Sequence, residues 1–198
     1  RGSNTELAVH LPAWCRAQGH SLTPAEGEAT WWIVRGSVEE GRWRNAERAG
    51  EANPSHVGAV VDSPKATWGL AARGATVEAG GPPFQFALAE KDALWAEEAA
   101  HLYQQALTAQ WNPDDAIDWS ASFELPNEIE DAVVQVMTYL IENENAALLM
   151  PARFLGQVHP HFREVMQLLA IQIADEARHV EVFTRRALLK RERMGLST

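Results

Sequence analysis

The chain has 198 residues, 46% hydrophobic and 22% charged, which is enough for one sizeable domain with a buried core. Its formal net charge of −10 excludes nucleic acid and anionic membranes as main partners, because phosphates would be repelled. Cys15 is the one cysteine and cannot form an internal disulfide, and no apolar stretch approaches the roughly 20 residues of a membrane-spanning helix. We therefore expect a cytoplasmic protein that neither binds nucleic acid nor crosses a membrane.

The residue pattern of the sequence changes at Gly80-Gly81-Pro82-Pro83, a cluster of helix-breaking residues. Before it, glycine and proline recur, and the apolar runs 31–34 and 57–61 are short enough to be strands or packed irregular segments. This part holds five of the eight tryptophans, whose large apolar area favours packing over disorder. We predict that residues 1–84 form an irregular, Trp-rich N-terminal extension and that residues 85–198 form a helical domain.

Three helical patterns follow in chain order. The first covers about 85–110 and stops before Asn112-Pro113; the second covers about 127–150, between two prolines; the third covers about 160–193 and ends at a glycine. Three long helices with connections of about ten to sixteen residues predict an all-α protein with a helix bundle. The chain opens without Met and stops directly after a helical pattern, so we expect this bundle to be incomplete, as in a fragment.

The third helix places a carboxylate in the middle of its apolar stripe. At 100° per residue, His179 lies about 60° from Glu176 and one turn away, so the two side chains can reach one point. An isolated ionised carboxylate there is costly and must be protonated, paired or bound to a metal. The apolar residues within about 40° of Glu176 are Val165, Leu169, Val180, Phe183 and Ala187.

The second helix repeats this arrangement around Glu144, whose direction is shared by Val133, Met137, Leu140 and Ala147. Glu142 points about 200° away, on a more polar face, but remains an alternative because a bundle core can be wider than one stripe. Carboxylates can bridge two metals and imidazole suits iron, so Glu144 or Glu142, with Glu176 and His179, are candidate metal ligands. Asp175, or a residue on an absent helix, is a candidate partner for the second nitrogen of His179.

Two segments carry a resemblance to a known group. Asp175-Glu176-Ala177-Arg178-His179 resembles the Asp/Glu-Glu-x-Arg/Lys-His motif of ferritin-like di-metal carboxylate proteins, and the segment from Trp111-Asn112-Pro113 to Ile117-Asp118-Trp119-Ser120 resembles the stretch before their first ligand helix. The similar families are the ribonucleotide reductase small subunit, ligand-binding oxidases and multicomponent monooxygenases. The resemblance covers about residues 100–190 and implies that they form a partial ferritin-like bundle.

The resemblance implies a ligand set, of which this chain carries half. Glu144 (or Glu142) would be the lone Glu, and Glu176 with His179 the first Glu-x-x-His pair; a second set would come from a homodimer or a missing C-terminal segment. In a rival register, whose spacing resembles that of ferritin and rubrerythrin, Glu98 and His101 are the first pair, Glu142 or Glu144 is the lone Glu, and Glu176 with His179 is the second pair. That register requires a further Glu near residue 65, where no helix is predicted.

The expected function is that of a non-haem di-iron (or Mn/Fe) oxidase or oxygenase. The resemblance implies two iron ions per completed site, or one manganese and one iron, with dioxygen and a small-molecule substrate as partners; the sequence assigns no catalytic residue and no substrate. The alternative is a non-catalytic helical interaction or structural module in which the buried Glu and His form salt bridges. An iron-storage role fits less well, because a Trp-rich extension is not typical of a cage subunit.

Overall fold

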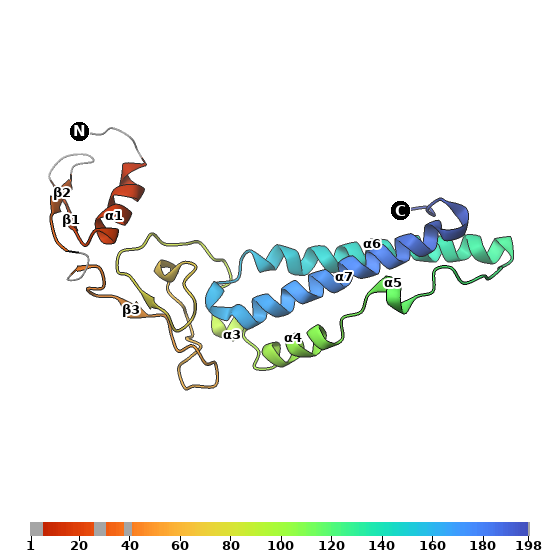
Figure 1. Cartoon of the computed structure of the whole chain (residues 1–198), viewed down its shortest axis with the longest axis horizontal. Helices are drawn as coiled ribbons and strands as arrows, with labels where there is room; N and C mark the ends of the chain where they lie inside the picture. Colours follow the sequence, from red (N-terminus) through yellow and green to blue (C-terminus); the bar gives the residue numbers. More distant parts are fainter. Residues whose placement is uncertain (1–5, 26–30, 38–40, 198) are drawn as a thin grey trace. The chain divides into compact units, whose positions relative to one another are not determined.

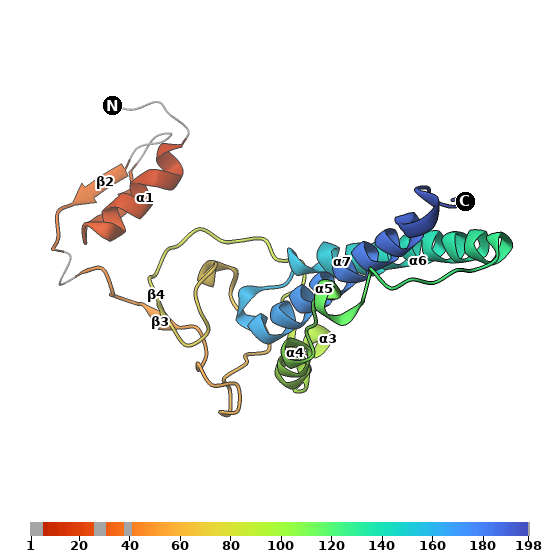
Figure 2. The same cartoon turned by 45° about the vertical axis from the view of Figure 1, so that its right-hand side comes forward.

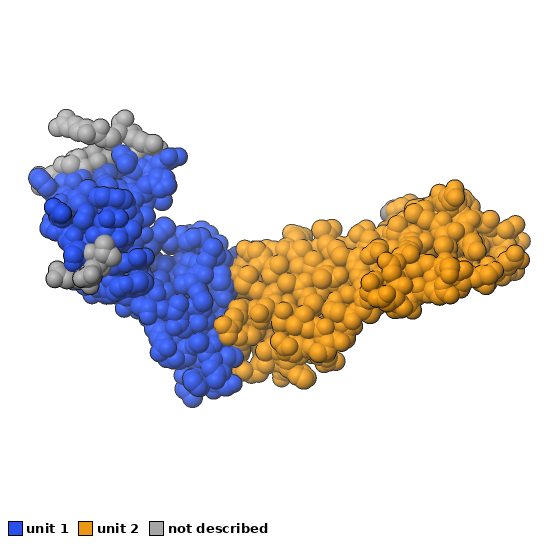
Figure 3. Space-filling model, viewed as in Figure 1, with its two compact units in different colours: residues 1–93, 159–161 blue, residues 94–158, 162–198 orange. Residues whose placement is uncertain are grey.

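The computed structural model describes residues 6–25, 31–37 and 41–197, and about 51% of the protein is helical. It divides into two compact units, coloured separately in Figure 3: Arg1–Ala93 with His159–His161, and Leu94–Val158 with Phe162–Thr198. The division falls between Ala93 and Leu94, whereas the sequence places the boundary after residue 84. The protein is mainly helical, as predicted.

The first unit contains more regular structure than the sequence indicates. Helix α1 (Leu7–Ala17) is followed by an antiparallel pair of strands, β1 (Ser21–Pro24) and β2 (Trp31–Val34). Of the two apolar runs, 31–34 is therefore a strand, whereas 57–61 forms turns and bends. The remaining elements are β3 (Glu47–Arg48) paired with β4 (Thr76–Val77), and the short helix η1 (Ala66–Trp68).

Two buried histidines from a distant part of the sequence complete the core of the first unit. His161 Nε2 accepts a hydrogen bond from Val61 N at 3.0 Å, and Arg73 Nη1 donates to His161 O at 3.0 Å. His159 Nδ1 accepts from the amide of His161 at 3.1 Å, so its Nε2 donates to Lys65 O at 3.2 Å. Because burial disfavours an imidazolium, it lowers the pKa of His159.

The second unit is built on two long antiparallel helices, α6 (Asn127–Leu155) and α7 (Arg163–Arg191), which lie side by side in both views (Figures 1 and 2). Helix α6 starts after Pro126 and carries acidic residues in its first turn, as the helix dipole favours. It continues through Pro151, so its predicted end at residue 150 is wrong. Helix α7 begins after the 3₁₀ turn η2 (Pro160–Phe162) and ends where Glu192 takes a left-handed conformation.

The first predicted helix, 85–110, is wrong in its extent. The structure forms α3 (Lys91–Leu94) and α4 (Ala99–Thr108), and residues 85–90 are not helical. The backbone of this segment forms hydrogen bonds to distant residues instead of helical ones: Lys91 N donates to Asp62 O at 2.8 Å, and His159 N donates to Leu88 O at 2.8 Å. Helix α4 packs on α7, and the short α5 (Pro113–Ala116) is capped by the side chain of Asn112.

A buried ion pair joins α6 to α7 near the start of α6. Arg186 Nη1 donates to Glu130 Oε1 at 2.6 Å and Nη2 donates to Oε2 at 3.0 Å, so the guanidinium grips the carboxylate with two parallel bonds. This pair lowers the pKa of the almost fully buried Glu130. None of the described helices is long and apolar enough to cross a membrane.

Candidate metal centre

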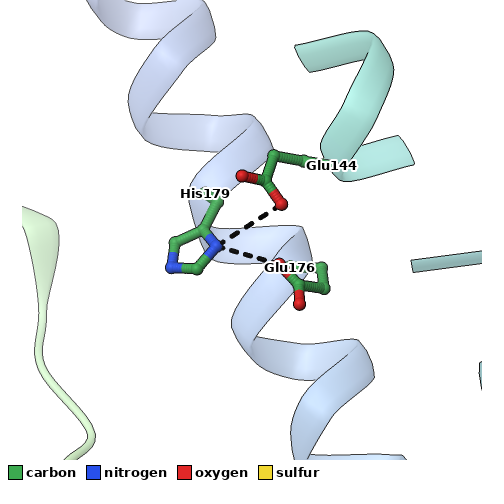
Figure 4. A group of neighbouring side chains, drawn as sticks. All are labelled: Glu144, Glu176 and His179. Carbon is green, nitrogen blue, oxygen red and sulfur yellow. Dashed lines mark hydrogen bonds and ion pairs between the residues drawn. The ribbon is translucent and has the colours of Figure 1, made fainter. Parts of the chain in front are cut away.

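Glu144, Glu176 and His179 meet near the middle of the helix pair. Glu144 projects from α6, Glu176 and His179 project from successive turns of α7, and the three side chains point toward one another (Figure 4). His179 Nδ1 lies 2.9 Å from Glu176 Oε2 and 3.7 Å from Glu144 Oε2. One potential ligand atom from each residue lies within 4.8 Å of the others. The helical phase therefore identified three residues that the fold brings together.

The three side chains are only partly covered. Glu176 exposes 16% of its side chain, Glu144 exposes 21% and His179 exposes 39%. The apolar residues that share their faces are half-buried as well, among them Leu140 on α6 and Leu169 on α7. The cluster thus lies in an apolar stripe that solvent still reaches.

Two carboxylates and one imidazole leave this cluster short of positive charge. Glu176 raises the pKa of Glu144 through their hydrogen bond and through its negative charge, and burial raises it further. The opposing effect of His179 is smaller. The ionised form of Glu144 is therefore disfavoured, and a bound cation would favour it.

The donor set suits a first-row divalent metal ion. Ligands bound to one such ion at about 2.0–2.2 Å lie at most about 4.4 Å from each other. The two separations from His179 Nδ1, 2.9 and 3.7 Å, fall within this limit. Three protein ligands leave coordination positions open, and carboxylate with imidazole is the ligand combination of non-haem iron sites. The residues present therefore fit a site for one such ion.

A hydrogen-bond network on the neighbouring flank fixes α7. Gln110 Nε2 donates to Asp175 Oδ1 at 2.9 Å, and Arg178 donates from Nη1 to Gln110 Oε1 at 2.6 Å and from Nη2 to Asp175. The Arg178 guanidinium also lies 5.3 Å from the ring centre of Trp111. Asp175 thus binds Gln110 and Arg178 rather than His179. No signal in the sequence points to Gln110, because its partners are 65 and 68 positions away.

The other candidate ligands lie elsewhere. Glu142 accepts a hydrogen bond from Ser197 on the C-terminal segment, which follows α6 through Thr138 and Gln135. Glu98 precedes the first residue of α4, and both Glu98 and His101 are exposed. The structure therefore groups Glu144, and none of these three, with Glu176 and His179.

No family model, curated protein or solved structure matches this chain. The ferritin-like resemblance accordingly remains a prediction from two sequence segments.

Proposed function

We propose that this chain carries one half of a carboxylate-bridged di-iron (or Mn/Fe) centre, in a ferritin-like oxidase or oxygenase that activates dioxygen. The observation that carries the proposal is the convergence of Glu144, Glu176 and His179 from two 29-residue helices. An exposed acidic cluster would not require an apolar surround. Here the ligand atoms lie inside an apolar stripe, where ionised carboxylates are unfavourable without a cation.

Each residue has a defined role in such a centre. His179 would bind through Nδ1, the ring nitrogen that faces both carboxylates, and Glu144 and Glu176 would each present an oxygen to the same ion. Ferrous iron, when bound, would supply the electrons that reduce dioxygen. Phe183, whose ring centre lies 6.3 Å from that of His179, and the apolar neighbours would limit water around the ligands. A small-molecule substrate would have to reach this same position.

A second candidate function is a helical structural or interaction module. It is favoured by the 2.9 Å contact of His179 Nδ1 with Glu176 Oε2, which is a complete ion pair without any metal when the imidazole is protonated. In that case, the cluster would join α6 to α7, as Glu130 and Arg186 do near the start of α6. The two functions make opposite predictions about metal uptake.

Metal content separates the two functions. The 198-residue chain would be produced in medium rich in iron and manganese and purified without oxygen. Its bound metals would then be quantified by elemental mass spectrometry. We expect about one or two metal ions per completed site, and loss of the metal in Glu176→Ala with helicity retained in circular dichroism. Glu181→Ala is the matched control, because Glu181 is an exposed Glu on the same helix. A metal-free wild-type chain would refute the metal centre and leave the structural module.

A further inference from the structure

The face of the helix pair that carries the cluster is uncovered. Around Glu176, the stripe on α7 is half-buried at every apolar position from Val165 to Phe183, and full burial is reached only at Ala187. The matching positions on α6 are half-buried too: Val133, Met137, Leu140, Ala147 and Leu148. In a completed bundle the centre of such a stripe is core. This face is therefore built to be covered by further helices.

Helix α4 does not provide the cover. Gln110, two residues after the end of α4, binds α7 at Asp175 and Arg178, which point about 100° and 160° away from Glu176 around the helix. Its own positions 101 and 102 are exposed. The occupant of the open face must therefore come from outside the described part of this chain's helical unit.

The ligand count identifies what the occupant has to bring. A di-metal carboxylate centre takes a Glu from each of two helices and a Glu-x-x-His pair from each of two others. Helix α6 supplies one Glu, and α7 supplies one Glu-x-x-His pair. The missing set is thus identical to the set present. Rotation by 180° about an axis through the cluster would generate four carboxylates and two imidazoles.

The position of the cluster suits this rotation. Both helices have 29 residues and are about 43 Å long. Glu144 is the eighteenth residue of α6 and Glu176 is the fourteenth of α7, so both lie near mid-length. A two-fold axis through the cluster would place the α6–α7 pair of one copy against that of the other over nearly the whole length of the helices. Had the ligands been near one end, half of each stripe would have stayed uncovered.

We propose that the occupant of this face is a second copy of this chain, which completes the centre with its own Glu144, Glu176 and His179. This inference rests on the proposed function, because the ligand count has meaning only for a metal centre. Two chains of net charge −10 repel each other, and the contact would bring four carboxylates together. Two divalent cations offset the charge of those four carboxylates. Dimerisation and metal binding should therefore depend on each other.

The test measures mass and metal together. The metal-free chain would be titrated with Co(II), whose visible absorption reports its coordination, and followed by light scattering and sedimentation. We expect a 21.9 kDa monomer without metal and a dimer of 2 × 21.9 = 43.8 kDa with two Co(II) ions. Diluting the protein should weaken the apparent Co(II) affinity, because a dimeric site depends on protein concentration.

Matched variants distinguish the effect of the metal ligands on dimerisation from the effect of the apolar face. Glu176→Gln should lower Co(II) affinity at least tenfold and abolish the dimer at the same concentration, whereas Glu181→Gln should leave both unchanged. Leu169→Lys places a charge on the stripe two turns from Glu176 and should prevent dimerisation while its helicity is retained.

Three results would overturn the inference, and they differ in what they imply for the function. Co(II) bound tightly by a monomer refutes the second copy but leaves the metal centre standing. A dimer that persists in Glu176→Gln without metal places the contact elsewhere. No Co(II) uptake refutes the metal centre and, with it, this inference.

Discussion

Replacing Glu144 with glutamine should stabilise the metal-free protein. The glutamine side chain would keep the shape of the original one and could donate a hydrogen bond to Glu176, but it carries no charge. A potential ligand oxygen of each carboxylate lies within 4.8 Å of the other. At that separation, two unit charges repel by about 3.5 kcal/mol at an effective dielectric constant of about 20, and by about 0.9 kcal/mol in water. The partial exposure of both side chains and the nearby His179 favour the lower half of this range.

We therefore expect Glu144→Gln to increase the free energy of unfolding by about 1–2 kcal/mol at pH 7 in the presence of a chelator. For a chain of this length that is a rise in Tm of about 2–8 °C, measured by circular dichroism at 222 nm. Glu181→Gln, on the exposed side of α7, should leave Tm unchanged.

Adding metal should reverse the order of the Tm values of the wild type and Glu144→Gln. A ligand at 100 times its Kd stabilises the folded state by about 2.7 kcal/mol, and only the wild type keeps the full donor set. The wild type should then become the more stable protein. A lower Tm for Glu144→Gln without metal would refute this reasoning, because it would show that the charged Glu144 holds the fold together as part of an ion pair.

Two further predictions concern the surrounding fold. Glu130→Ala should cost about 3 kcal/mol in chemical denaturation, the lower end for a broken buried pair, because Arg186 is 20% exposed and keeps its contact with Phe123. Since Arg186 lowers the pKa of Glu130, this stabilisation is present above the unfolded value near 4.5 and is lost as pH falls through the folded value; an acid titration of Glu130→Ala should lack that step. In the first unit, Gly50→Ala should destabilise by several kcal/mol in tryptophan-fluorescence unfolding, because its Cβ would lie 2.4 Å from Ala59 O at φ +73°. Gly58→Ala has a similar φ of +75° and open space, so it should cost only about 1 kcal/mol; equal losses would contradict the steric argument.

The sequence predicted those features that depend on local periodicity. The long helices α6 and α7 are visible in the 3.6-residue pattern, and the same pattern favoured Glu144 over Glu142 by direction, with Glu142 kept as an alternative. In the structure, Glu142 accepts a hydrogen bond from Ser197, which is 55 positions away in the sequence.

What the sequence did not predict depends on contacts between distant segments. Residues 85–90 carry a helical pattern, but the backbone at Leu88 and Lys91 forms hydrogen bonds with His159 and Asp62 instead. The segment His159–His161 belongs to the core of the first unit, although it lies between two helices of the second. Helix α1 contains Pro12, a residue that argues against a helix interior. None of these outcomes follows from propensity within a short window.

Helix α6 itself contains the comparison that best distinguishes a metal site from a structural ion pair. Glu130 and Glu144 are both acidic residues that interact with α7. Glu130 meets a guanidinium through two bonds, and its pKa is lowered; Glu144 meets another carboxylate and an imidazole, and its pKa is raised. A cluster that serves stability alone would be expected to resemble the first arrangement, with an arginine at position 176 or 179. The deficit of positive charge inside an apolar stripe supports the proposal that Glu144 binds a cation, and this contrast between two glutamates of one helix is the physical reason for proposing different roles for them.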